Sequence, residues 1–377
     1  MRPYILLTPG PLTTSETVKS TMLEDWCTWD DEYNLDIVQH IRSELVGLAT
    51  GSPDDYTSVL LQGSGTFAVE GALTCSVPED GKLLVLANGA YGDRMAEIAR
   101  YAKISHDVIS FPETETVCPD MLDRFLGRHR DVTHVSFVHC ETTTGILNPL
   151  EALCSIVKKH GKTLIVDAMS SFGGIPFDAG RLGIDLLVSS ANKCIQGVPG
   201  FGFIIARKEA LEKCKGNAAS LSLDIYDQWE TMEKKRGKWR FTSPTHVVRA
   251  FQQALKELHE EGGITARHAR YKANHRILVE GMTRLGYAPL LPDEKQSPII
   301  TSFLYPDPSF CFETFYNRLK QKGFVIYPGK ISQTDTFRIG TIGDVYERDF
   351  EALIKAVEET TASPRPSTKE SGTELPR

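Results

Sequence analysis

Residues 134–168 read HVSFVHCETTTGILNPLEALCSIVKKHGKTLIVDA and contain two apolar runs separated by a helical pattern. The runs, 134–140 and 162–168, are nearly continuous in Val, Ile and other apolar residues, as in strands buried on both faces. Between them, residues 150–161 carry apolar side chains at helical spacing and end on Gly161, a typical helix terminator. This stretch therefore predicts two buried parallel strands joined by a helix.

The same pattern of apolar runs and helices extends over residues 60–206. A second helical segment, 91–103, follows the first of these runs. Buried strands joined by helical crossovers are typical of a mostly parallel sheet that helices cover on both faces. We therefore predict an α/β fold with ligands bound at the carboxyl ends of the strands. The predicted strands are 82–88, 134–140, 162–168, 185–191 and 202–208.

The rest of the chain predicts a smaller α+β domain, and a length of 377 residues favours more than one domain. It follows a long helical stretch, 245–263, and its elements are a strand at 298–305, a helix at 312–323, strands at 324–330 and 336–340, and a helix at 346–359. The tail is rich in Ser, Thr, Pro and charged residues, which predicts disorder. The predicted division is an N-terminal segment (1–20), a large domain (21–245), a helical connector (246–285), a small domain (286–360) and the tail (361–377).

Composition excludes several classes of protein. The formal net charge is -7 and there is no basic tract, which argues against general affinity for nucleic acid or anionic membranes. No apolar run approaches the ~20 residues of a spanning helix. The eight cysteines are scattered, without disulfide or zinc spacing, so we predict reduced thiols, no metal site and a cytoplasmic location.

Two residues at predicted strand ends carry unusual charges. Lys193, in SSANKCIQGVPGFGF (189–203), has small and apolar neighbours, where a lysine loses its proton readily and can bond to an aldehyde. A lysine that extends to the surface is the ordinary alternative. Asp167 ends a buried strand, where a carboxylate needs a cation or a strong donor. The protonated ring nitrogen of pyridoxal phosphate is one such partner, and a cap on the next turn is another.

Residues 63–66, with the sequence GSGT, directly precede a predicted helix. Ser64, Gly65 and Thr66 precede an apolar helix, where backbone N–H groups, hydroxyls and the helix dipole can bind a phosphate. An ordinary capped helix start would look the same. Neither a Walker A motif nor a G-x-G-x-x-G fingerprint is present, which weakens an ATPase or a dinucleotide-dependent enzyme.

Three further residues are candidates only when they are considered together with Lys193, Asp167 and the helix start at Ser64. Tyr91 lies beside two glycines at a predicted strand end and could stack on a flat ring, although an aromatic there is more often core. Thr142 follows another strand and could bind a ring hydroxyl, or simply belong to a polar turn. Arg338 could bind a carboxylate or phosphonate through two parallel hydrogen bonds, or pair with a structural acid.

The chain resembles the fold type I pyridoxal-phosphate enzymes, whose large domain has a mostly parallel, seven-stranded type of sheet. The resemblance rests on four features in this order: the helix start at Ser64, Gly65 and Thr66, which we call the glycine cup, then Asp167, Lys193 and Arg338. Within class V, the chain from about residue 4 to 358 resembles the 2-aminoethylphosphonate:pyruvate aminotransferase family. The motifs that carry the resemblance are LLTPGPLTTS, CTWDDEYN, LLQGSGTFAVE, ETTTGILNP, VDAMSSFGG, SSANKCIQGVPGF, GKWRFTSPTH, GFVIYPGK and FRIGTIG.

The resemblance implies a role for each candidate. Lys193 would bond to pyridoxal 5'-phosphate and Asp167 would face its ring nitrogen. Arg338 would bind the acidic end of the substrate. Trp239 and Thr242 would reach the cofactor phosphate of a neighbouring subunit, which implies a homodimer. The remaining residues that would line the cofactor are Ser64, Gly65, Thr66, Tyr91, Thr142, Met169 and Asn192.

The implied reaction converts 2-aminoethylphosphonate and pyruvate into phosphonoacetaldehyde and L-alanine, a step of phosphonate degradation. A class V aminotransferase that pairs alanine or serine with glyoxylate is the main alternative. A cysteine desulfurase is less compatible, because that class commonly has a His before the lysine, where this chain has Asn192. A non-catalytic phosphate- or cofactor-binding protein would explain the glycine cup but not Lys193, Asp167 and Arg338 together.

Overall fold

A seven-stranded sheet forms the centre of the large domain in the computed structural model, which describes residues 4–331 and 334–362. Neighbouring strands from β9 through β8, β5 and β3 to β4 are parallel, whereas β10 is antiparallel to both β9 and β2. The predicted mostly parallel sheet is thus confirmed. In spatial order the strands are β2 (Tyr56–Gln62), β10 (Phe201–Arg207), β9 (Leu186–Ser190), β8 (Thr163–Asp167), β5 (His134–Val138), β3 (Leu83–Ala87) and β4 (His106–Ser110).

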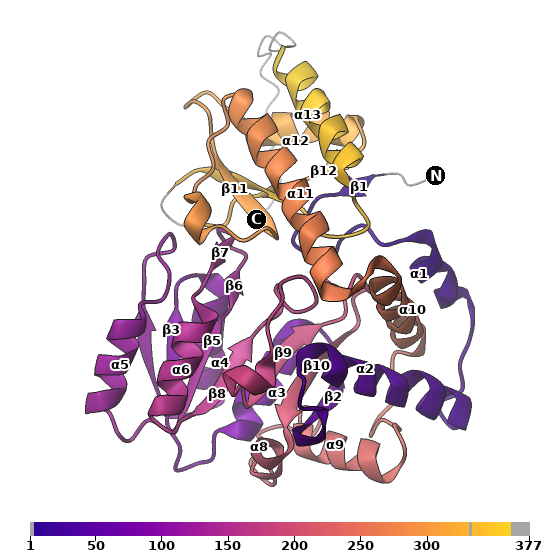
Figure 1. The fold of residues 1–377 in the computed structure, drawn as a ribbon, viewed down its shortest axis with the longest axis vertical. Helices are drawn as coiled ribbons and strands as arrows, with labels where there is room; N and C mark the ends of the chain where they lie inside the picture. Colours follow the sequence, from indigo (N-terminus) through magenta and orange to yellow (C-terminus); the bar gives the residue numbers. More distant parts are fainter. Residues whose placement is uncertain (1–3, 332–333, 363–377) are drawn as a thin grey trace, which may run out of the picture.

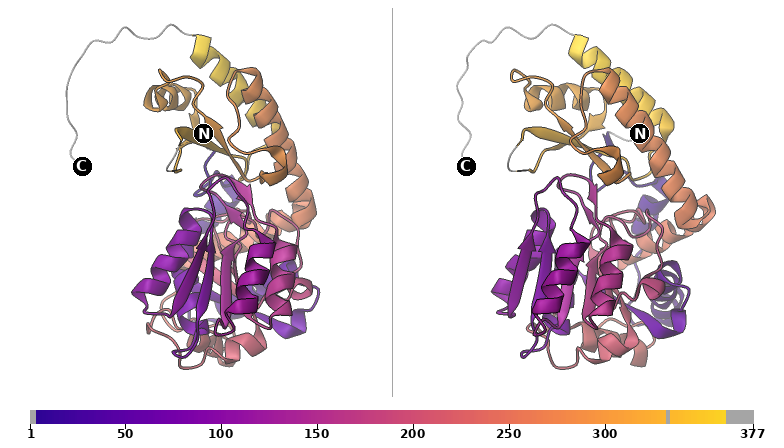
Figure 2. Two further views of the ribbon diagram at one scale, coloured as in Figure 1. Left: turned by 90° about the vertical axis from the view of Figure 1, so that its left-hand side faces the viewer. Right: turned by 60° about the vertical axis from the view of Figure 1, so that its left-hand side comes forward.

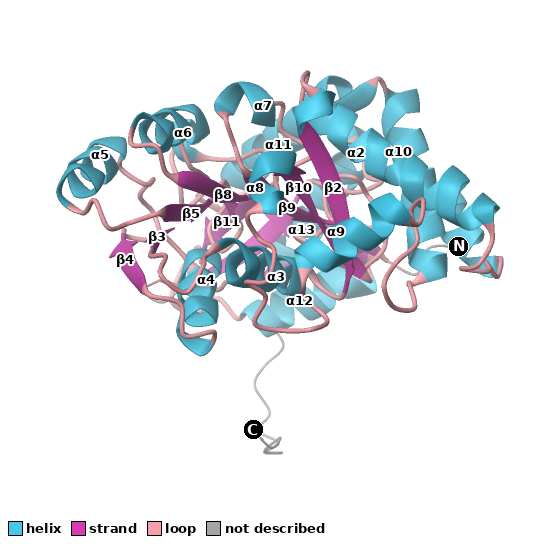
Figure 3. Ribbon diagram, turned by 90° about the horizontal axis from the view of Figure 1, so that it is seen from below, coloured by secondary structure: helices cyan, strands magenta, loops and turns pink. Residues whose placement is uncertain are grey.

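Helices cover both faces of this sheet (Figure 3), as the apolar runs predicted. One core contains Leu45, Leu153 and Phe203, and the other, on the opposite face, contains Val69, Val85 and Ile98. The helices that contribute buried residues to the first core include α2 (His40–Ala49), α5 (Pro119–Arg128), α6 (Leu150–Lys159) and α7 (Ala179–Leu182). Those of the second core include α3 (Gly65–Ser76), α4 (Ala90–Tyr101) and α8 (Lys208–Glu212), while α9 (Ile225–Lys234) reaches both.

Two long helices lead from the large domain to the small one (Figure 1). The predicted helical stretch 245–263 is α10 (Thr245–Glu261), and α11 (Gly263–Arg284) follows after Gly262, whose φ of +105° favours glycine. In the small domain α11 packs against α13 (Glu347–Ala362). The three-stranded sheet beside them has the order β11 (Ile300–Leu304), β14 (Thr336–Gly340), β13 (Tyr327–Pro328), and α12 (Phe312–Gln321) adjoins it.

The N-terminal segment belongs to both halves of the molecule. Its strand β1 (Ile5–Leu6) pairs in parallel with β12 (Phe324–Val325) of the small domain, and Pro9 then contacts the large domain. The views in Figure 2 place the start of the described chain beside the small domain. The predicted strand 324–330 is therefore two short strands with different partners, because β12 pairs with β1 and β13 pairs with β14.

The remaining elements are short. They are α1 (Glu16–Ser20), a π-helical segment (Glu32–Gln39) that leads into α2, 3-10 turns at Thr21–Leu23, Pro53–Asp55 and Asp293–Lys295, and the hairpin of β6 (Cys140–Glu141) and β7 (Ile146–Leu147). Helix α13 extends to Ala362, and the rest of the tail predicted as disordered lies outside the described residues. None of the eight cysteines is in a disulfide. Across residues 4–331 and 334–362, no helix combines the length and the apolarity needed to cross a membrane.

Candidate active site

A cavity of about 360 Å³ lies where strands β8 and β9 end and helices α3 and α4 begin. Most of the residues that line it were predicted from the sequence, and the structure brings these together from four separate segments. They are Ser64, Gly65, Thr66, Tyr91, Asp167, Met169, Asn192 and Lys193. Pro11, Val69, Arg94, Ser190, Pro199 and Gly200 complete the lining.

Lys193 lies in the turn that follows β9, beneath the N-terminal segment. Burial lowers the pKa of its ammonium group, while the nearby Cys194 and Asp167 act in the opposite direction. Its Nζ donates a hydrogen bond of 2.6 Å to the Pro9 carbonyl. A Cβ at Gly10, whose φ is +123°, would lie 3.0 Å from this Nζ. Because the pKa of Lys193 is lowered, its amine loses its proton more readily than an ordinary lysine does, as nucleophilic lysines require.

Asp167 is the last residue of β8, the strand next to β9. It is 5% exposed, and burial raises its pKa to about 6, even though Met169 donates a backbone hydrogen bond to its Oδ1 at 2.8 Å. Within the described part of the chain, no cation forms an ion pair with it at 4.0 Å or less. A buried carboxylate without such a partner fits a cationic ring nitrogen supplied by a bound group.

The N-terminus of α3 faces this cavity. Ser64 is the N-cap residue, in extended conformation, and its side chain makes no capping hydrogen bond. The hydroxyl and the first N–H groups of the helix are therefore available to an anion. Gly65 is required by space, because a Cβ there would lie 2.4 Å from the Met169 Sδ. These features fit the phosphate of pyridoxal phosphate.

We expect Gly65→Ala to weaken cofactor retention. The added methyl group must displace Met169 and so distort the helix start, which should raise the apparent dissociation constant for pyridoxal phosphate about tenfold or more. Equilibrium dialysis followed by absorbance would measure it. Gly47→Ala, at a helix position where a Cβ meets nothing within 4 Å, is the matched control. Equal retention of pyridoxal phosphate in both variants would contradict the assignment of Ser64, Gly65 and Thr66 to phosphate binding.

Tyr91 lies at the centre of a cationic cluster that sequence analysis missed. Arg94 Cζ and Lys330 Nζ are each 5.0 Å from the centroid of its ring. Arg94, on α4, also lines the cavity, whereas Lys330 follows β13 of the small domain. The i,i+3 spacing of Tyr91 and Arg94 on a helix start was a usable signal. Nothing in the sequence placed Lys330 beside them.

Arg338 lies beside the cavity rather than in its lining. Its Nε donates to the Pro328 carbonyl at 3.0 Å and its Nη1 to the Thr142 carbonyl at 2.9 Å. The side chain is 5% exposed, and burial lowers its pKa. The charge of Arg338 also contributes to the lowered pKa of Lys193. Thr142 thus contacts Arg338 through its backbone, which sequence analysis did not anticipate.

The other predicted residues lie as follows. Asn192 accepts a hydrogen bond from the Ser190 hydroxyl at 3.0 Å through its Oδ1. Trp239 is buried in its own chain, with its ring edge-to-face on Phe201 at 6.2 Å between centroids. Thr242 is exposed. Contact with a neighbouring subunit stays a prediction for both, and Thr242 is the more accessible of the two.

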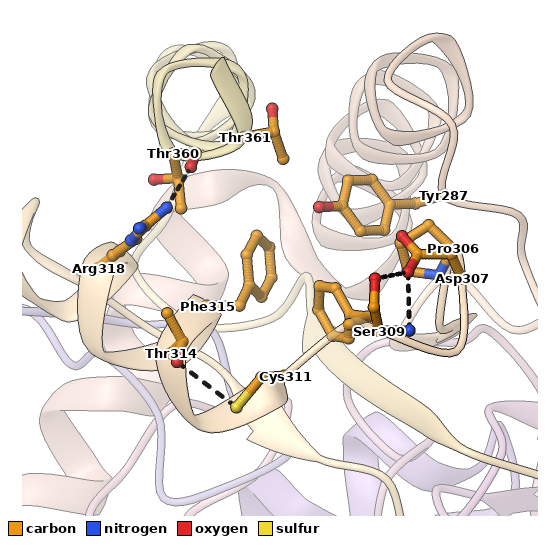
Figure 4. A pocket seen from close by; sticks show the side chains of 11 residues that line it. Tyr287, Pro306, Asp307, Ser309, Cys311, Thr314, Phe315, Arg318, Thr360 and Thr361 are labelled. Atoms are coloured by element: carbon orange, nitrogen blue, oxygen red, sulfur yellow. Dashed lines mark hydrogen bonds between the residues drawn. The ribbon is translucent and has the colours of Figure 1, made fainter. Parts of the chain in front are cut away.

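The small domain contains a second cavity, of about 350 Å³, away from this chemistry (Figure 4). Tyr287, Phe310 and Phe315 line it, with Cys311 at the start of α12 and Arg318 bonded to the Thr360 carbonyl. It contains no lysine among its lining residues. Separately, the described residues include no group of three or more His, Cys, Asp or Glu side chains that could hold a metal ion.

Comparison with known proteins assigns the chain to a class of enzyme. The family model named aminotransferase class-V matches residues 36–329. Pyridoxamine-pyruvate aminotransferase from Mesorhizobium loti superposes with a TM-score of 0.87 at 24% identity, over 96% of this chain and 92% of that one. Alanine--glyoxylate aminotransferase from Nostoc sp. gives 0.88 at 24%, over 95% of each chain. The chain belongs to the class V aminotransferases, and the predicted fold class is confirmed.

Curated relatives within this class have much higher identity. The 2-aminoethylphosphonate--pyruvate transaminase of Bacteroides fragilis (strain YCH46) is 67% identical over 360 residues, which cover 96% of this chain and 99% of that protein. The protein of the same name from Vibrio vulnificus (strain CMCP6) is 62% identical over 356 residues, or 94% of this chain and 97% of that one. Both relatives are named for the same two substrates, 2-aminoethylphosphonate and pyruvate.

Proposed function

We propose that this enzyme transfers the amino group of 2-aminoethylphosphonate to pyruvate with pyridoxal 5'-phosphate as cofactor, giving phosphonoacetaldehyde and L-alanine. One structural observation carries the proposal. A partly buried lysine and a buried carboxylate without a cation lie at the ends of neighbouring strands in one cavity, next to a helix N-terminus. The names of relatives at 67% and 62% identity support the choice of substrates.

The cavity residues divide the binding of the cofactor among them. Ser64, Gly65 and Thr66 bind its phosphate at the start of α3, where the helix dipole favours an anion. Tyr91 would support the flat ring, and Asp167 would keep the ring nitrogen protonated. When bound, pyridoxal phosphate supplies an aldehyde that reacts with amines and a ring that accepts electrons from a breaking C–H bond.

Lys193 has two tasks in this account. Its Nζ would be the point of covalent attachment for the cofactor. With a substrate amine in the site, Nζ would be the group that takes the proton from the substrate carbon next to the nitrogen, as general base, and donates it again as general acid. Burial, which lowers its pKa, suits both tasks because the neutral amine is the reactive form.

Arg338 binds the acidic end of both substrates. The Pro328 and Thr142 carbonyls fix its guanidinium through Nε and Nη1, so its remaining Nη2 can donate to a phosphonate or to a carboxylate. One site can therefore accept 2-aminoethylphosphonate and pyruvate in turn.

The proposal includes a homodimer in which Trp239 and Thr242 approach the partner's cofactor phosphate. Large aromatic side chains near the predicted contact are exposed, with 50% of Phe67 and 54% of Phe241 accessible to solvent. Phe67 follows Thr66 at the start of α3, and Phe241 precedes Thr242. Such exposure is typical of a surface covered by another subunit. Sedimentation velocity should give a dimer, and a monomer at assay concentrations would exclude the shared site.

An assay of amino donors and acceptors tests the proposed reaction. With pyruvate as acceptor, alanine formation from 2-aminoethylphosphonate should exceed that from serine and taurine by at least about a hundredfold in kcat/KM. Alanine and serine with glyoxylate should likewise be poor pairs. If either glyoxylate reaction were the faster, the enzyme would be the alternative class V aminotransferase.

A further inference from the structure

We propose that Arg94 and Lys330 form a second cationic pair, separate from Arg338, that selects the phosphonate substrate over carboxylates. The proposal rests on the proposed function, because it assigns specificity within that reaction. Arg94 comes from the large domain and Lys330 from the small one, so the pair forms only where the two domains meet. Both charges lie at 5.0 Å from the ring of Tyr91, which lines the cavity.

These cations lack the acidic partners that comparable cations have elsewhere in the molecule. Arg42 pairs with Glu233 at 2.5 Å and Arg267 with Glu261 at 2.8 Å. In contrast, neither Arg94 nor Lys330 has a carboxylate within 4.0 Å in the parts of the chain that the structure describes. Arg94 makes one long hydrogen bond, from Nη1 to the Thr66 hydroxyl at 3.4 Å. Its other N–H groups are available to a ligand.

The carboxylate of Glu141, whose charge acts on both Lys330 and Arg338, is already committed to backbone donors. Glu141 is fully buried, and its carboxylate accepts hydrogen bonds from the N–H groups of Tyr91 at 3.0 Å, Gly92 at 3.3 Å and Thr143 at 3.1 Å. It therefore stabilises the start of α4 and forms no ion pair with the cluster. Lys330 is exposed, but partial desolvation and repulsion from Arg94 and Arg338 lower its pKa, and an incoming anion would offset the repulsion.

The chemistry of the two substrates explains why a second pair is useful. A phosphonate resembles a phosphate ester, with three acceptor oxygens and a charge approaching −2 near neutral pH, whereas a carboxylate has two oxygens and one charge. Arg338 alone can satisfy a carboxylate through its free Nη2. The additional oxygen and charge of a phosphonate require further donors, and Arg94 and Lys330 supply them.

The test compares the two half-reactions in Arg94→Gln, Lys330→Gln and the double variant. In ping-pong kinetics, kcat/KM for each substrate reports its own half-reaction. We expect kcat/KM for 2-aminoethylphosphonate to fall about tenfold to a hundredfold per variant, and that for pyruvate by less than about threefold. Arg338→Gln should lower both. The charge-conserving Lys330→Arg should restore most of the preference.

Matched controls come from cations that lie over tyrosines elsewhere. Arg100 lies on the same helix as Arg94, 4.6 Å from the Tyr101 ring, and Lys320 lies 5.8 Å from the Tyr316 ring. Arg100→Gln and Lys320→Gln should leave both kcat/KM values unchanged. Equal losses for the two substrates in the Arg94 and Lys330 variants, or no loss, would overturn the proposal. So would a loss in Arg94→Gln that saturating pyridoxal phosphate repairs, because it would assign Arg94 to the cofactor.

A binding measurement separates this proposal from the proposed function. Ethylphosphonate and propionate differ only in their acidic group, and calorimetry on the cofactor-loaded enzyme should give tighter binding of ethylphosphonate by about tenfold or more. The double variant should lose this preference. Wild-type enzyme that shows the preference but does not transaminate 2-aminoethylphosphonate would overturn the function alone. Active enzyme without the preference would overturn the selector alone.

Discussion

Lys193→Ala is expected to reduce transamination between 2-aminoethylphosphonate and pyruvate by at least about a thousandfold, since general acid–base catalysis alone contributes up to about 10⁴-fold. The variant removes both the covalent attachment and the group that moves the proton. The phosphate cup at Ser64–Thr66 is untouched, so the cofactor should still bind, although reversibly. The coupled assay for alanine, run beside a cofactor titration, measures both effects.

A covalent readout separates a chemical role of Lys193 from a structural one. After borohydride reduction, mass spectrometry should find the cofactor attached to Lys193 in the wild-type chain and unattached in the variant. Lys213→Ala, at an exposed lysine that pairs with Glu209, is the control and should behave as wild type. Turnover near the wild-type rate in Lys193→Ala would refute its assignment.

Asp167→Asn is expected to lower kcat by about a hundredfold or more, because a neutral amide cannot hold the ring nitrogen in its cationic, electron-accepting form. The change keeps the size of the side chain, so the cavity should stay intact. Asp178→Asn, which removes a carboxylate at the N-terminus of α7 away from the cavity, is the control for a generic effect of lost charge. Retention of wild-type kcat in Asp167→Asn would contradict the proposed contact.

The same variant should be more stable than wild type when no cofactor is bound. Burial raises the pKa of Asp167 from 3.8 to about 6, so between these values the native protein holds a proton that the unfolded chain has released. The free energy of unfolding of the cofactor-free wild type therefore falls as the pH rises through this interval. This single group costs up to about 3 kcal/mol at pH 7. Urea unfolding at pH 4 and pH 7 would show whether Asp167→Asn removes the loss.

The sequence predicted the part of the fold that rests on local pattern. Strands β3, β5, β8, β9 and β10 are apolar runs, and all of them form near the expected positions. Strand β4, HDVIS, escaped prediction because it lies at the edge of the sheet and is only partly buried. Strand β2 was also missed, although it is buried along most of its length.

The candidate site likewise combines residues that local sequence patterns predict with contacts that they do not. Lys193, Asp167 and the glycine cup each follow or precede an element that the sequence predicts, and parallel strands bring their carboxyl ends to one edge. The contact between Pro9 and Lys193 depends on the pairing of β1 with β12, which lie far apart in the chain. Lys330 likewise reaches Tyr91 only because the small domain adjoins the large one. Local patterns carry no signal for contacts of this kind.

The central claim is that one site takes an amino group from a phosphonate and passes it to pyruvate. Adding 2-aminoethylphosphonate without pyruvate to the purified, cofactor-loaded enzyme tests it most directly. We predict that the visible absorbance band shifts and about one phosphonoacetaldehyde is released per subunit, as a ping-pong half-reaction requires. Pyruvate should then restore the band and yield an equal amount of L-alanine. A colourless protein, or a band that responds to serine or alanine but not to 2-aminoethylphosphonate, would contradict the account.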